Sequence, residues 1–207
     1  MIYLFPVVIC ISLNLLLLKV ISSLNIQKIS LNKSSIILIC VILTFNAFIS
    51  MEFGKFLNLY LFKSYSSLFG GVLLLFTGAN FLIEHKKITE YKNGYDTSFY
   101  YETFSNCRKF FFTPSIIDSN NSKYIELNES IYISIPLCLC TFFIFFAAGT
   151  TLINIPFTLL LIFLSTMLVL CTSLSNKINI LSNWLDKNCF FSVSIIIIIY
   201  GILQILI

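Results

Sequence analysis

The sequence predicts an all-α membrane protein whose six transmembrane helices form two inverted three-helix repeats. Three observations lead to this fold class. Six apolar stretches are each long enough to cross the hydrocarbon core of a bilayer. Hydrophobic residues make up 58% of the chain and charged residues only 11%, with a mean hydropathy of +0.95. Lysine and arginine, finally, gather in every second connecting segment.

The apolar stretches follow one another with short gaps, except for one long polar segment between the third and the fourth. The first stretch begins Met1-Ile2-Tyr3 without a basic residue, and no small-x-small cleavage site follows it. We therefore expect a mature helix rather than a secretion signal. In chain order, the six stretches comprise residues 2–21, 36–53, 68–83, 131–148, 156–174 and 189–207.

The distribution of Lys and Arg predicts how the chain is oriented and divided. Ten of these residues lie in the segments after the first, third and fifth spans, and two lie in the segments on the opposite side. Because positive charge biases a loop towards the cytoplasm, we expect both termini outside the cell. The division is then a first repeat (1–83), a cytoplasmic connecting loop (84–129) and a second repeat (130–207). Lys19, near the inner end of the first span, is expected to snorkel to the interface.

The repeats are predicted to be inverted because an odd number of spans lies on each side of the long loop. The two halves then cross the membrane in opposite directions, as in many transporters. Aligning Gly78 of the third span with Gly201 of the sixth places Asn14 opposite Cys140 with nearly the same spacing. The local sequence thus agrees weakly with the repeat that the charge pattern predicts.

Composition and motifs argue against several classes of function. The chain has no G-x-S-x-G, H-E-x-x-H or P-loop pattern, so we expect no enzymatic activity. The net charge of +4 forms no basic stripe with interleaved aromatic residues, so we expect no nucleic-acid partner. His85, the single histidine, stands beside two lysines at the inner membrane edge and is interpreted as a solvated interfacial group.

The seven cysteines are interpreted as reduced thiols, because six of them lie inside or beside apolar spans. Cys138 and Cys140 form a C-x-C pattern that suggests a soft-metal ligand pair. Residues two apart on a helix point roughly 200° away from each other, so the two sulfurs cannot chelate one ion by themselves. Packing of small polarizable side chains is the preferred interpretation.

Several short segments resemble a known family of membrane proteins. The chain has Gly78 in the third span, Gly201 in the sixth, and the runs Ser67-Leu68-Phe69-Gly70-Gly71 and Trp184-Leu185-Asp186-Lys187. In these features and in its 3+3 layout it resembles the sporulation membrane protein YtaF family, which is related to manganese efflux pumps of the MntP type. The resemblance implies an accessory role in spore formation or, through the pumps, the export of a divalent cation.

The resemblance also draws attention to a stretch like a calcium loop just before the fourth span. Asp118, Asn120 and Ser122 match positions 1, 3 and 5 of the twelve-residue loop, and Glu129 matches position 12. Lys123, however, occupies the position of the turn glycine. We expect a degenerate loop with weak affinity for calcium. The alternative is a polar turn that ends in Asn128 or Glu129 at the start of a helix.

A cation pathway through the membrane would need oxygen ligands on facing helices. The resembling pumps carry an Asp in the first span and another in the fourth, and the matching positions here are Asn14 and Cys140. Glu52, a carboxylate near the end of the second span, is an uncertain third member of this candidate site. Its alternative role is an interfacial i,i+3 ion pair with Lys55.

These considerations predict a multi-pass protein of the bacterial cell membrane with a non-enzymatic accessory role in spore formation and a degenerate cation site. The alternative is a divalent-cation efflux transporter, with manganese as the ion. We expect no cofactor other than a weakly bound divalent cation, and the identity of any metal stays open. The bilayer is the expected partner, and the loop 84–129 could contact a second copy or another membrane protein.

Overall fold

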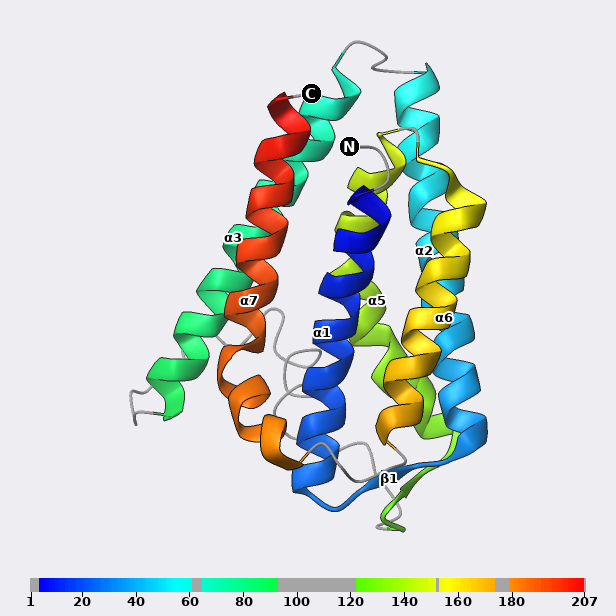
Figure 1. Cartoon of the computed structure of the whole chain (residues 1–207), viewed down its shortest axis with the longest axis vertical. Coiled ribbons are helices and arrows are strands. Elements are labelled where there is room, and N and C mark those ends of the chain that lie inside the picture. The colour runs from blue at the N-terminus through cyan, green and yellow to red at the C-terminus, as the bar shows by residue number, and fades with distance from the viewer. Residues whose placement is uncertain (1–3, 61–64, 93–121, 152, 174–178, 207) are drawn as a thin grey trace.

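The computed structural model describes residues 4–60, 65–92, 122–151, 153–173 and 179–206. Within these residues, six helices are long and apolar enough to cross a membrane, which confirms the prediction of a multi-pass helical membrane protein. The helices are α1 (Leu4–Ile26), α2 (Lys33–Tyr60), α3 (Ser66–Lys92), α5 (Leu127–Gly149), α6 (Ile155–Ser173) and α7 (Asn179–Leu206) (Figure 1).

Five of the six helices are longer than the apolar stretches that predicted them, and α6 has the same length as its stretch. Helix α3 runs past Ile83 to Lys92, so the first part of the segment predicted as the loop 84–129 is helical, and α5 already begins at Leu127. Hydropathy marks only the part of a helix that lies in hydrocarbon, whereas the backbone stays helical into the interface, where charged side chains are tolerated.

A pair of two-residue strands was not predicted. Strand β1 (Ser30–Leu31) pairs in parallel with β2 (Tyr124–Ile125), with Ser30 opposite Tyr124 and Leu31 opposite Ile125. Left-handed residues precede both strands, Lys28 with φ 58° and Lys123 with φ 62°. Two residues are too few to show an alternating pattern in a sequence. The pairing nevertheless matters, because it sets the N-termini of α2 and α5 side by side.

The two ends of the bundle differ: one contains the chain termini and the other contains the strand pair. Helix α1 begins and α7 ends at one end, which we call the terminal end. Helix α3 ends at the opposite end, the loop end, where α2 and α5 begin beside the strands (Figure 1). Helices α1 and α5 occupy the middle of the bundle, α3 and α7 lie on one side, and α2 and α6 lie on the other.

The helices pack across the sequence rather than along it. Among the described residues, every extensive helix–helix contact joins a member of α1–α3 to a member of α5–α7. The most extensive contacts are those of α3 with α7 and of α2 with α5, followed by α1 with α7. Neither group of three helices therefore forms a packed unit without the other.

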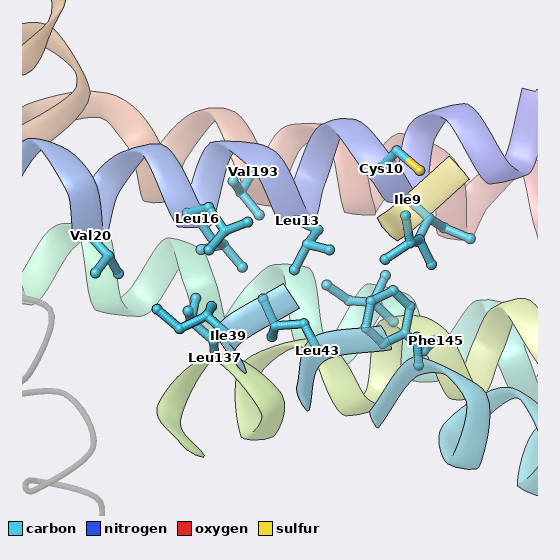
Figure 2. Packing of buried hydrophobic residues seen from close by; sticks show 14 of the residues in the cluster. Ile9, Cys10, Leu13, Leu16, Val20, Ile39, Leu43, Leu137, Phe145 and Val193 are labelled. Carbon is cyan, nitrogen blue, oxygen red and sulfur yellow. The ribbon is translucent and has the colours of Figure 1, made fainter. Parts of the chain in front are cut away.

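The centre of the bundle is a dense aliphatic core. Leu13 and Leu16 of α1 point towards Leu43 of α2 and Leu137 of α5, with Phe145 close by (Figure 2). Each of these side chains is at most 1% exposed. The outward faces of the same helices carry large apolar side chains that are open to the surroundings, as expected for a bundle in lipid.

Two pairs of glycines allow the closest approaches between helices. Gly54 of α2 lies against Gly149 of α5, and a Cβ atom on Gly54 would overlap the carbonyl oxygen of Phe146. Gly71 of α3 lies against Gly201 of α7, where an added Cβ on either residue would lie 2.8–2.9 Å from the carbonyl oxygen of the other. Small residues of this kind let membrane helices meet backbone to backbone.

Lys19 does not snorkel, contrary to the prediction. Its side chain is fully buried at 0% exposure, although it lies in a membrane-spanning helix. The prediction rested on the position of Lys19 near the end of the span, but its side chain is enclosed within the bundle. Ionisable residues inside membrane spans usually do so, because hydrocarbon solvates a charge poorly.

We expect Gly54→Ala to lower the free energy of unfolding by about 2 kcal/mol, because the methyl group has no room between α2 and α5. The measurement is the unfolding midpoint in mixed detergent micelles. Val41→Ile, which adds one carbon to the exposed face of the same helix, is the matched control and should leave the midpoint unchanged. Equal stability of Gly54→Ala and the native chain would contradict the close contact.

Candidate functional site

Asn14 and Cys140 lie on two helices that pack together in the middle of the bundle. Asn14 is half-buried near the middle of α1, and its side-chain oxygen is buried without a hydrogen-bond partner in the described structure. Cys140 is half-buried on α5 and packs against the aliphatic core. Helices α1 and α5 contact each other. Each of the two residues lies near the middle of its helix, and no hydrogen bond joins them within the described residues.

Glu52 lies apart from this level of the membrane. Asn46, on the same helix, reaches Cys138 and Thr141 of α5 and so marks the level of Cys140. Glu52 is six residues further along α2, which corresponds to about 9 Å along the helix axis. In the described part of the chain no ion pair joins Glu52 to Lys55. The structure therefore does not bring Glu52 to the other two candidate residues.

Asn46 is a polar residue of the spans that sequence analysis missed. Its Nδ2 atom donates to the carbonyl oxygen of Cys138 and to the hydroxyl of Thr141, both at 3.3 Å. This contact ties α2 to α5 near the middle of the membrane. An isolated amide in an otherwise apolar span is the signal that could have identified it, since such side chains commonly bond across helices.

A second missed group satisfies the C-terminal end of α5. Gln204 Nε2 of α7 donates to the Ala147 carbonyl at 3.2 Å and to Thr150 Oγ1 at 3.0 Å. Asn58 Nδ2 of α2 donates to the Thr150 carbonyl at 2.8 Å. The last carbonyls of a helix have no donor within the helix. The hydroxyl of Thr150 donates to the Ala147 carbonyl from within the same segment, side chains of α2 and α7 add further donors, and Gly70 of α3 leaves the space for them.

Hydroxyl groups in the spans are mostly bonded to their own helix. Ser12 donates to the Ile9 carbonyl at 2.8 Å, Thr77 to the Leu74 carbonyl at 2.9 Å and Ser194 to the Phe191 carbonyl at 2.7 Å. Such bonds to the preceding turn satisfy a hydroxyl inside an apolar environment. The protons of these hydroxyl groups are therefore bonded within their own helices.

The cysteines behave as packing residues. Cys138 and Cys140 both pack against the buried core, as the preferred interpretation of the C-x-C pattern predicted. The six cysteines that the structure describes are thiols rather than disulfides. Within the described residues there is also no group of three or more His, Cys, Asp or Glu side chains that could hold a metal ion.

Only half of the calcium-loop-like stretch lies in the described structure, since Asp118 and Asn120 fall outside it. Ser122 Oγ donates to the Tyr124 carbonyl at 2.8 Å, so this carbonyl, at loop position 7, already has a donor. Lys123 adopts the left-handed backbone that the turn position of a calcium loop needs, although it is not a glycine. The turn is therefore present without the residue that normally allows it.

Glu129 serves the start of α5. Its Oε2 atom accepts a hydrogen bond from the backbone N–H of Glu126 at 3.1 Å and completes a capping box. The side chain is only 5% exposed. This is the arrangement that the alternative to a calcium loop predicted, with Glu129 near the helix start.

We expect Glu129→Ala to lower the free energy of unfolding by about 1 kcal/mol, because it removes the capping acceptor. Glu129→Gln keeps an oxygen acceptor and should retain most of the stability. Calcium at about 1 mM should leave the unfolding midpoint of the native chain unchanged, because the loop is degenerate. A calcium-dependent rise that Glu129→Gln abolishes would show instead that the loop binds the ion.

Comparison of the chain with protein-family models, curated proteins and solved structures gives no match.

Proposed function

We propose that the chain is a non-enzymatic accessory protein of a bacterial cell membrane, with a role in spore formation and a degenerate cation site. The observation that carries this proposal is the aliphatic filling of the bundle centre. Leu13, Leu16, Leu43, Leu137 and Phe145 occupy the region where the two groups of helices meet (Figure 2). A dehydrated cation has no ligands among such side chains.

The proposed scaffold is an inverted repeat, in which α1, α2 and α3 correspond to α5, α6 and α7. Each helix runs in the opposite direction to its counterpart (Figure 1). Exchanging the counterparts also reproduces the pattern of contacts: the contact of α2 with α5 becomes that of α6 with α1, and the contact of α1 with α7 becomes that of α5 with α3. The contact of α3 with α7 is unchanged by the exchange. This correspondence supports a two-fold axis in the membrane plane.

We propose the cytoplasmic side for the loop end of the bundle. Four exposed lysines gather there, Lys28, Lys33, Lys86 and Lys123. The terminal end has only the half-buried Lys55 among its described side chains. Lysine near the ends of spans favours the cytoplasmic face, so this arrangement supports termini outside the cell.

The role in spore formation rests on the family resemblance and has a direct test. We expect deletion of the gene in its own spore-forming host to lower the number of heat-resistant spores, and we expect the native gene to restore it. The measurement is a plate count after heating. Unchanged spore numbers would contradict this part of the proposal and leave only a general accessory role in the membrane.

Cation export is the second candidate function, and one observation favours it. The side-chain oxygen of Asn14 is buried and has no hydrogen-bond partner in the described structure. An amide oxygen is a ligand that divalent cations of the manganese type accept. Cys140 on α5 would add a sulfur ligand.

Manganese tolerance separates the two functions. In a host that lacks its own exporter, we expect the native chain neither to lower cell-associated manganese nor to protect against the metal. Asn14→Asp together with Cys140→Asp restores two carboxylates at the matching positions. Ser12→Asp together with Cys138→Asp, on the same two helices, is the matched control, and membrane expression is checked for every variant.

Protection by the native chain would overturn the accessory role and support export through amide and thiol ligands. Protection by Asn14→Asp/Cys140→Asp, but not by the control pair, would show a pump scaffold whose ion site has lapsed in this chain, in agreement with the proposal. Failure of all variants agrees with an accessory role as well.

A further inference from the structure

One side chain departs from the apolar character of the lipid-facing surface. In the described parts of the six spans, the exposed residues more than a turn from a span end are apolar or aromatic, with the exception of Asn80 on α3. The other amides deep in the spans are buried or half-buried. Asn80 is therefore the one amide deep in the described spans whose side chain is exposed on the lipid-facing surface.

Asn80 belongs to a stripe on the outer face of α3. Val72, Phe76, Ala79 and Ile83 are exposed on the same side, and Phe76 is 66% exposed. Helix α3 lies at the edge of the bundle and packs mainly on α7 (Figure 1). Gly71 lets α3 pack closely on α7, so one side of α3 contacts the bundle and the opposite side is exposed.

Asn80 lies in the apolar part of α3, near its loop end. Glu84, the first charged residue beyond it, is four residues further along α3, which corresponds to about 6 Å along the helix axis, and the span ends at Lys86. Lipid chains offer an amide no hydrogen-bond partner, and asparagine in membrane helices commonly bonds to a neighbouring helix. No described residue of this chain bonds to the Asn80 side chain.

We propose that the outer face of α3 is the interface between two copies of this chain, with Asn80 of one copy against Asn80 of the other. Two copies with the same orientation in one membrane place this residue at the same depth. An amide both donates and accepts, so two asparagines related by a two-fold axis along the membrane normal bond to each other reciprocally. Ala79, beside Asn80, is small enough for the two α3 helices to approach closely.

The test is energy transfer between fluorophore-labelled copies of the full chain in phosphatidylcholine vesicles, measured at decreasing protein-to-lipid ratios. We expect the native chain to form dimers and Asn80→Leu to weaken them about tenfold. Asn80→Gln keeps an amide and should retain most of the association. Ala79→Trp should block the interface by its bulk, whereas Leu164→Trp, on the exposed face of α6, is the matched control and should not.

Four results would overturn the proposal. The native chain could stay monomeric at high protein-to-lipid ratios, Asn80→Leu could dimerise as well as the native chain does, or Leu164→Trp could disrupt association while Ala79→Trp does not. The unfolding midpoint of each variant shows whether a lost signal comes from misfolding. A different membrane protein bound through Asn80, in place of a second copy, would also overturn it.

Discussion

The pairing of α2 with α5 is the interaction on which the rest of the bundle depends. The parallel strands set the two helix starts together, and Ser35 Oγ donates to the Ile125 carbonyl at 2.8 Å just above them. Asn46 joins the helices near mid-membrane, and Asn58 joins them at the terminal end. Between these amides the contact of Gly54 with Gly149 brings the backbones together. The other helices pack against this tied pair or against partners that contact it.

Polar groups in the spans act mainly on structure. The carbonyls at the end of α5 accept hydrogen bonds from the hydroxyls of Thr150 and Thr151, and Gln204 and Asn58 add donors from other helices. Glu129 caps the start of the same helix. The residues that looked most like ligands in the sequence are thus dispersed, and the amides that make contacts are bound to backbone carbonyls. Asn14 is the exception that keeps cation export as a second candidate.

The presence of six membrane-spanning helices could be predicted because it depends on composition along the chain. Apolar runs identify the spans. They do not identify the extension of α3 to Lys92, because that part of the helix is polar. The direction of a side chain was harder to predict, as Lys19 shows, because α1 is apolar on all sides and does not reveal which side meets the core. The candidate residues Asn14 and Cys140 came from matching the two halves of the sequence. Asn46 is detectable as an amide in an apolar span, but the partners of Asn46 and Gln204 can be identified only once the neighbouring helices are known.

The absence of extensive packing within either group of three described helices has a consequence for biosynthesis. When α1, α2 and α3 have entered the membrane, the helices against which they pack have not yet been synthesised. Their inward faces, including Lys19 and Gly54, are then open to lipid or to an insertase until the second group follows. The bundle becomes stable only after the second group has entered the membrane, because its packing contacts join residues far apart in the sequence. Contacts of this kind form slowly. The interval between the two insertion events is consequently the stage at which this chain is most exposed to quality-control proteases.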